Sequence, residues 1–154
     1  MSVERSKTDY IVIHCSATPP DMDIGREEIT KWHKARGFRE IGYHFVIRRN
    51  GGVERGRWVL IPGAHVKGYN SVSVGVCMVG GVDSDMKPED NFTGDQWGAL
   101  LDVVSTLKGD FPEAKIVGHT ELDSGKACPS FDVQQWVKRV KIIKEEKDYG
   151  RNLF

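Results

Sequence analysis

Hydrophobic and polar positions alternate, or apolar positions run together, in five short stretches that predict β-strands. In the first, residues 10–15, one face carries Ile11, Ile13 and Cys15, and the other carries Tyr10, Val12 and His14. Four more strands are predicted at residues 42–48, at 53–58 after an Asn-Gly turn, at 72–79 and at 115–118. Because His14 and Cys15 point in opposite directions, Cys15 is expected in the core and not beside His14 as a ligand.

Apolar residues at helical spacing predict three helices between and after these strands. The first follows a Pro-Pro-Asp turn, with Asp23 as its N-cap and Gly37 as the residue just past its end. Thr93 and Gln96 form a capping-box pattern in front of a second helix. A last helix is predicted from residue 133 to about 148, with its apolar side chains turned inward.

The order of these elements predicts an α/β fold, a single domain with a mixed central β-sheet flanked by helices. We expect this domain to span residues 10–148, between an N-terminal arm at 1–9 and a C-terminal tail at 149–154. A chain of 154 residues is long enough to bury a hydrophobic core without disulfide or metal staples.

The charge balance and the N-terminus narrow the choice of partners and compartment. Lys plus Arg and Asp plus Glu number 22 each, so neither nucleic acid nor an anionic membrane is an expected partner. The three cysteines lack redox spacing, which favours reduced thiols. No signal peptide and no apolar run of roughly 20 residues is present, so we expect cytoplasmic synthesis without membrane insertion. A monomer is expected because no apolar surface stripe is evident.

Two histidines and a cysteine carry the strongest chemical signal. His14 lies at the end of the first strand, His119 directly follows the strand at 115–118, and Cys128 comes nine residues after His119. These are suitable ligands for a zinc ion that keeps its fourth position open, whereas a structural zinc site would show paired ligand motifs. An open zinc site predicts hydrolysis.

Two more side chains could assist such a reaction. Lys126 lies two residues before Cys128 and could stabilise an oxyanion, and Tyr43 could donate or accept a proton. Each residue also has an ordinary structural interpretation, since strand histidines, surface lysines and packed tyrosines are common. A cysteine hydrolase that pairs Cys128 with His119 remains an alternative, although it leaves His14 without a role.

Six motifs occur in an order that resembles a known enzyme family. They are Ile13–Thr18 (IHCSAT), Trp32-His33, Gly42–Phe45 (GYHF), His65–Asn70 (HVKGYN), Ser73–Cys77 (SVGVC) and Lys126–Phe131 (KACPSF). Together they resemble the zinc-dependent N-acetylmuramoyl-L-alanine amidases of the amidase-2 family, to which peptidoglycan recognition proteins are related. The likeness is strongest to small single-domain phage endolysins of the T-seven lysozyme type, and it covers nearly the whole chain.

This resemblance implies hydrolysis of the amide between the lactyl group of N-acetylmuramic acid and L-alanine in peptidoglycan. It implies one zinc ion (Zn2+) held by His14, His119 and Cys128, and Tyr43 and Lys126 as catalytic residues. A loop with His65, Lys67 and Asn70 would line the substrate groove. The enzyme would reach the cell wall through a holin-type membrane lesion and lyse the host.

Two alternatives accompany this interpretation. Some relatives bind muropeptides without cleaving them, typically where the cysteine ligand is replaced, and Cys128 is present here. A related phage enzyme also binds and inhibits its phage's RNA polymerase, so a polymerase is a further candidate partner, although no motif in this chain encodes such a contact.

Overall fold

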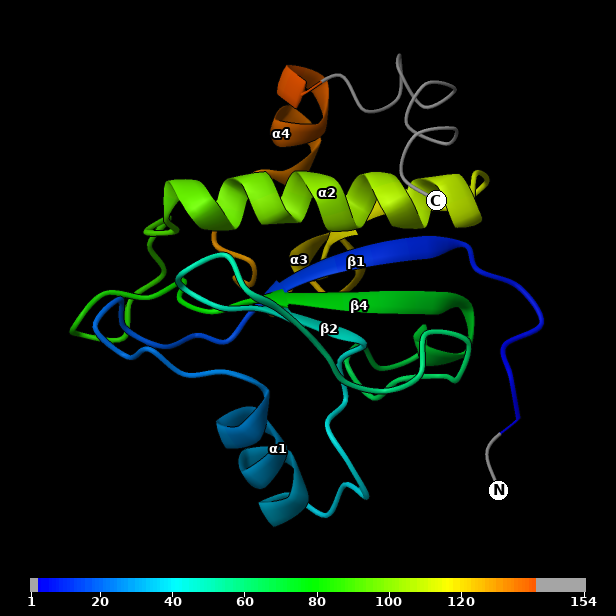
Figure 1. Ribbon diagram of the computed structural model, residues 1–154, viewed down its shortest axis with the longest axis horizontal. Helices are drawn as coiled ribbons and strands as arrows, with labels where there is room; N and C mark the ends of the chain where they lie inside the picture. The colour runs from blue at the N-terminus through cyan, green and yellow to red at the C-terminus, as the bar shows by residue number, and fades with distance from the viewer. Residues whose placement is uncertain (1–2, 141–154) are drawn as a thin grey trace.

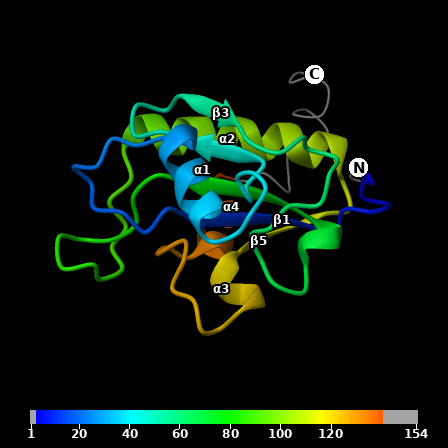
Figure 2. The same cartoon turned by 90° about the horizontal axis from the view of Figure 1, so that it is seen from below.

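A single five-stranded sheet forms the centre of the protein. The computed structural model describes residues 3–140, and the prediction of a last helix beyond residue 140 lies outside them, as does the predicted tail. The strands are β1 (Tyr10–Cys15), β2 (Phe45–Ile47), β3 (Val53–Arg55), β4 (Ser73–Met78) and β5 (Lys115–Gly118). Their order is β3-β2-β4-β1-β5, with β3 antiparallel to β2 and the other pairs parallel (Figures 1 and 2). The predicted mixed sheet is confirmed.

Helices cover both faces of this sheet. They are α1 (Arg26–Ala35), α2 (Gly94–Asp110), the short α3 (His119–Leu122) and α4 (Val133–Val140), with a 3-10 turn η1 (Asn70–Val72) before β4. The long helix α2 lies along one face and α1 lies on the opposite one (Figures 1 and 2). Within residues 3–140, no helix is long and apolar enough to cross a lipid bilayer.

The face of the sheet under α2 holds the main hydrophobic core. Ile11, Ile13 and Cys15 of β1 point into it, as the alternation predicts, and Leu100 and Val104 of α2 pack against them. Trp136 of α4 closes the same cluster. The opposite face of β1 carries Val12 and the His14 ring, so the apolar and polar sides of one strand are separated by its pleat.

Local details of the first helix and of β2 differ from the sequence predictions. Helix α1 has Gly25 as its N-cap, not Asp23, because the Glu28 carboxylate reaches back to accept a hydrogen bond from the Gly25 amide at 2.8 Å. The end of the helix is as predicted, since Gly37 adopts a φ of 97° there. Strand β2 is shorter than predicted, because the Gly42 amide leaves the sheet and donates to His33 Nδ1 at 2.8 Å.

Candidate metal centre and active site

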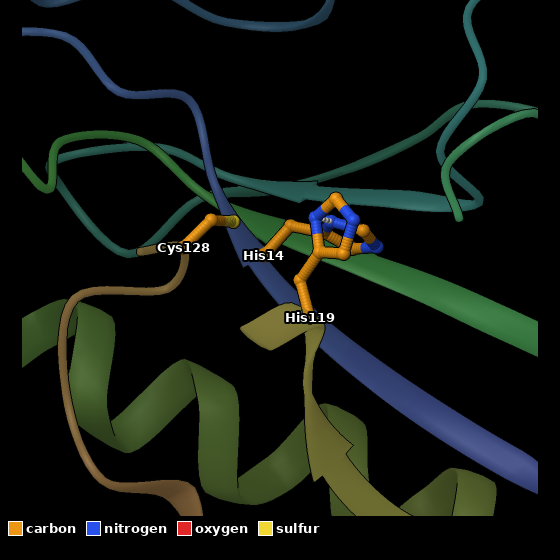
Figure 3. Close-up of side chains that lie close together, drawn as sticks. All are labelled: His14, His119 and Cys128. Carbon is orange, nitrogen blue, oxygen red and sulfur yellow. Dashed lines mark hydrogen bonds between the residues drawn. The ribbon is translucent and has the colours of Figure 1, made fainter. Parts of the chain in front are cut away.

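His14 and His119 lie side by side because of the register between two parallel strands. Ile13 of β1 pairs with Gly118 of β5, so the next residue on each chain reaches the same edge of the sheet. The side chains share a face, since Val12 and Val117 pair two residues earlier. The two Nδ1 atoms are 3.1 Å apart (Figure 3). The sheet therefore fixes this pair.

Cys128 reaches the pair from the loop between α3 and α4 (Figure 3). Its thiol accepts a hydrogen bond from the Cys15 amide at 2.9 Å, and its carbonyl accepts one from the Thr120 amide at 2.9 Å. The ligand atoms of His14, His119 and Cys128 all lie within 4.8 Å of one another. The end of β1, the start of α3 and the loop after α3 thus bring together the two imidazoles and the thiol that the sequence predicts as ligands.

The protonation states of His14, His119 and Cys128 determine how they can bind a metal cation. Burial lowers the pKa of His14 well below its ordinary value, and the neighbouring His65 and His119 rings add to this effect. Burial also lowers the pKa of His119. Both rings are therefore neutral at pH 7, and each can offer a lone pair. The contact with Cys15, together with burial, raises the pKa of the Cys128 thiol, so metal binding at this site must release a proton. This donor set fits zinc with one position left open.

Tyr43 lies against the same cluster. Its ring centroid is 5.1 Å from that of His14 and 5.3 Å from that of His33. Burial is the largest cause of a pKa for Tyr43 well above its ordinary value, and the nearby cysteines add to it. The phenol is therefore protonated at neutral pH and can act as a hydrogen-bond donor.

Lys126 is exposed on the loop that carries Cys128. Its backbone amide donates to the Asp123 carbonyl at 3.0 Å, which folds the loop back towards α3. Its charge is close enough to His119 to contribute to the lowered pKa of that ring, after the larger effect of burial. The catalytic role of Lys126 stays a prediction.

The comparisons with known proteins agree with this geometry. Residues 4–131 match the family model described as N-acetylmuramoyl-L-alanine amidase. The chain belongs to this amidase family.

Sequence matches between the amidase and its relatives extend over almost the whole length of this chain. The chain is 49% identical to the endolysin of Enterobacteria phage K11 over 144 residues, 94% of this chain and 95% of the relative. It is 42% identical to the endolysin of Escherichia phage T7, again over 94% and 95% of the two chains. Among solved structures, the Ph2119 endolysin from a Thermus scotoductus bacteriophage matches with a TM-score of 0.72 and 30% identity, over 92% of this chain and 88% of that one. The family and fold inferred from the sequence motifs are confirmed.

The three residues predicted to line the substrate groove have different surroundings in the amidase. Lys67 is exposed. Asn70 uses its side-chain oxygen to accept hydrogen bonds from the amides of His65 and Val66, at 2.8 and 3.0 Å, and so holds the loop in shape. His65 is only 9% exposed and lies 2.8 Å from His14. Contact of these residues with substrate remains a prediction.

Two residues of the site were not identified from the sequence. His33 of α1 is 6% exposed and packs against Tyr43. Ser73 is fully buried, and its hydroxyl oxygen lies 3.2 Å from His65 Nε2. The signal for Ser73 was its place in β4, where it shares a face with Gly75 and pairs with Tyr10, on the same face of β1 as His14.

Proposed function

We propose that this amidase is an endolysin that hydrolyses the amide between N-acetylmuramic acid and L-alanine in peptidoglycan. The observation that carries the proposal is the convergence of His14, His119 and Cys128 within 4.8 Å, in a chain whose relatives are phage endolysins. We propose Zn2+ as the ion, one per chain, because two neutral imidazoles and a thiolate match its preferred ligands. A zinc ion with three protein ligands can polarise a carbonyl group and activate water.

The protein groups around the centre have separate tasks in this proposal. The Lys126 ammonium stabilises the negative charge that develops on the substrate carbonyl oxygen. The protonated Tyr43 hydroxyl donates a hydrogen bond to the reacting groups and assists proton transfer to the leaving amine. Lys67, exposed on the loop before η1, contacts the stem peptide or the sugar. The presence of Cys128 favours catalysis over a binding module, because replacing the thiol would remove one of three proposed ligands.

A test of the proposal measures which bond is broken in purified peptidoglycan. The expected products are new N-terminal L-alanine amines without new reducing sugar ends, abolished by a chelator and restored by zinc. New reducing ends would instead identify a glycosidase. If the protein sediments with the cell wall but releases neither product, it is a binding module.

The roles of Tyr43 and Lys126 can be separated from metal binding. We expect Tyr43→Phe and Lys126→Ala each to lower kcat by roughly 100-fold or more, since each removes a group that acts in the transition state. The zinc content should stay at one ion per chain. Lys115→Ala, an exposed lysine on β5, is the matched control and should keep full turnover. Full turnover in Tyr43→Phe, or loss of zinc in Lys126→Ala, would contradict the assigned role.

Other expectations stay predictions. They are the monomeric state, an RNA polymerase as a second partner, and passage to the cell wall through a membrane lesion. Size-exclusion chromatography and a pulldown with the cognate polymerase would test the first two.

A further inference from the structure

His65 uses both of its ring nitrogens inside the protein. His65 Nδ1 lies 2.8 Å from His14 Nε2, and His65 Nε2 lies 3.2 Å from the Ser73 hydroxyl oxygen. Ser73 is 0% exposed and His65 is 9% exposed, so water cannot easily replace either contact. The contacts form a continuous chain from β4 to the candidate metal centre.

The donor and acceptor of each hydrogen bond in this series follow from its Ser73 end. The Ser73 hydroxyl donates to the Tyr69 carbonyl at 2.8 Å, and a carbonyl can only accept. A hydroxyl has one proton, so the Ser73 oxygen must accept from His65 Nε2–H. A neutral imidazole carries one proton, which leaves His65 Nδ1 without one. His65 Nδ1 therefore accepts from His14 Nε2–H.

As a result, His14 Nδ1 carries no proton at the candidate metal centre. This atom faces His119 Nδ1 at 3.1 Å, where the lone pair is needed for a metal ion. The His65 ring is 9% exposed and its nitrogens face an imidazole and a hydroxyl group, so a neutral ring satisfies both contacts. A backbone carbonyl on the η1 side of the sheet thus determines which nitrogen of His14 is free.

The lack of a side chain at Gly75 leaves room for the His65 ring. Gly75 of β4 lies directly under the His65 ring, and a Cβ atom at Gly75 would stand 2.7 Å from His65 Cγ and 2.8 Å from Nδ1. Any side chain there would push the ring away from His14. Asn70 fixes the other side by holding the His65 backbone amide at 2.8 Å.

We infer that His65 and Ser73 are positioning residues, which fix the orientation and tautomer of His14 so that its Nδ1 can bind the metal. The inference rests on the proposed metal centre and gives His65 a task other than substrate contact. Partners of this kind typically contribute 10- to 100-fold, by rough measure, to metal affinity. A residue that only contacted substrate would change KM and leave the zinc affinity unaltered.

The test is the dissociation constant for zinc, measured by competition with a chromophoric chelator on the full chain. We expect His65→Leu to weaken zinc binding by about 10- to 100-fold. His65→Asn should recover much of this loss, because its amide oxygen can take the place of Nδ1 and accept from His14. Ser73→Ala should weaken binding less than His65→Leu, and Ser71→Ala, an exposed serine two residues earlier, should not change it.

A second measurement does not depend on how well the variants fold. In the zinc-free wild-type protein, nitrogen NMR of the imidazoles should show both His65 and His14 protonated at Nε2. A His14 proton on Nδ1, or equal zinc affinity in wild type and a folded His65→Leu, would overturn the inference. Failure of the wild-type protein to bind zinc would instead overturn the proposed metal centre, so the two failures are distinct.

Discussion

Both faces of the central sheet contain fully buried residues, but the interactions that these residues make differ. On the α2 face, Ile11 and Ile13 are 0% exposed and pack among apolar side chains. On the α1 face, His14 is 1% exposed and Ser73 is 0% exposed, and both are held by hydrogen bonds. Apolar packing is non-directional, whereas each hydrogen bond fixes a donor and an acceptor. The larger apolar cluster lies on the α2 face, whereas the α1 face combines smaller apolar clusters with the hydrogen-bonded groups of the candidate metal centre.

The pairing of polar atoms supports this division. On the histidine face, His44 has partners for both ring nitrogens, in the Gly75 amide at 2.9 Å and the Ile61 carbonyl at 2.7 Å. Across residues 3–140, the buried side-chain polar atom found without a partner is the Ser105 hydroxyl of α2, next to the apolar core. The buried ring nitrogens of His44 are thus paired, whereas the buried hydroxyl of Ser105 on α2 is not.

The largest expected effect comes from removing a ligand on the histidine face. Cys128→Ala should weaken zinc binding by more than about 100-fold, since loss of a direct ligand exceeds the usual effect of its outer partners. Amidase activity at limiting zinc should disappear with it. Cys77→Ala is the control, because Cys77 is a fully buried thiol in β4 outside the ligand cluster. It should lower stability and keep one zinc per chain, as measured by metal analysis after dialysis. Retention of tight zinc binding in Cys128→Ala would remove the thiol from the metal centre.

Truncation of a core side chain on the α2 face should lower stability and leave zinc binding and turnover unchanged. Leu100 is 0% exposed in the core under α2, and Leu100→Ala should lower the free energy of unfolding by about 2–5 kcal/mol. Below the unfolding transition, kcat and the zinc affinity of the folded protein should not change. Urea unfolding with the metal removed, followed by kinetics at low temperature, measures both quantities. If kcat falls together with stability, the two faces are coupled and the comparison fails.

Much of the metal centre could be predicted from sequence because it depends on strand register. The alternation in residues 10–15 places His14 and Cys15 on opposite faces of β1. His119 directly follows β5, which is parallel to β1, so these two strands bring His14 and His119 together. Cys128 could be added because the chemistry of its thiol completes a known ligand set. These inferences use only local periodicity and ligand type, which a single sequence contains.

The environment of His65 could not be predicted in the same way. Its position depends on the irregular loop before η1, which Asn70 holds through two backbone amides. The burial of His33 depends on the Gly42 amide leaving the sheet, again a feature without periodicity. Helical spacing groups His33 with Ile29 but does not specify what covers it, and the contact with Tyr43 decides its burial.

Acidification should destabilise the histidine face selectively. Burial lowers the pKa of His44 to about 4 from an ordinary value of 6.5, so the unfolded chain takes up the proton first as the pH falls. The stability from neutral His44 is complete above pH 6.5 and is lost progressively down to pH 4. Between pH 7.5 and 5 we expect a loss of about 2 kcal/mol from His44. The lowered pKa values of His14 and His65 add to it.

Urea unfolding of the metal-free protein at the two pH values measures this loss. Leu100→Ala, on the other face, should lower the unfolding free energy by the same amount at both values, because it leaves the histidines in place. A wild-type stability that does not change with pH would contradict the assignment of neutral, buried imidazoles.

The smallest expected effect compares one serine from each face under the same substitution. Ser105 and Ser73 are 1% and 0% exposed, but only the Ser73 hydroxyl has partners. Ser105→Ala removes an unsatisfied hydroxyl from a helix and should raise the free energy of unfolding by up to about 1 kcal/mol. Ser73→Ala should lower it by about 1–3 kcal/mol, because His65 Nε2–H and the Tyr69 carbonyl lose their partner. Opposite signs in parallel urea titrations would show that equal burial has different consequences on the two faces, and equal signs would show that pairing does not decide the outcome.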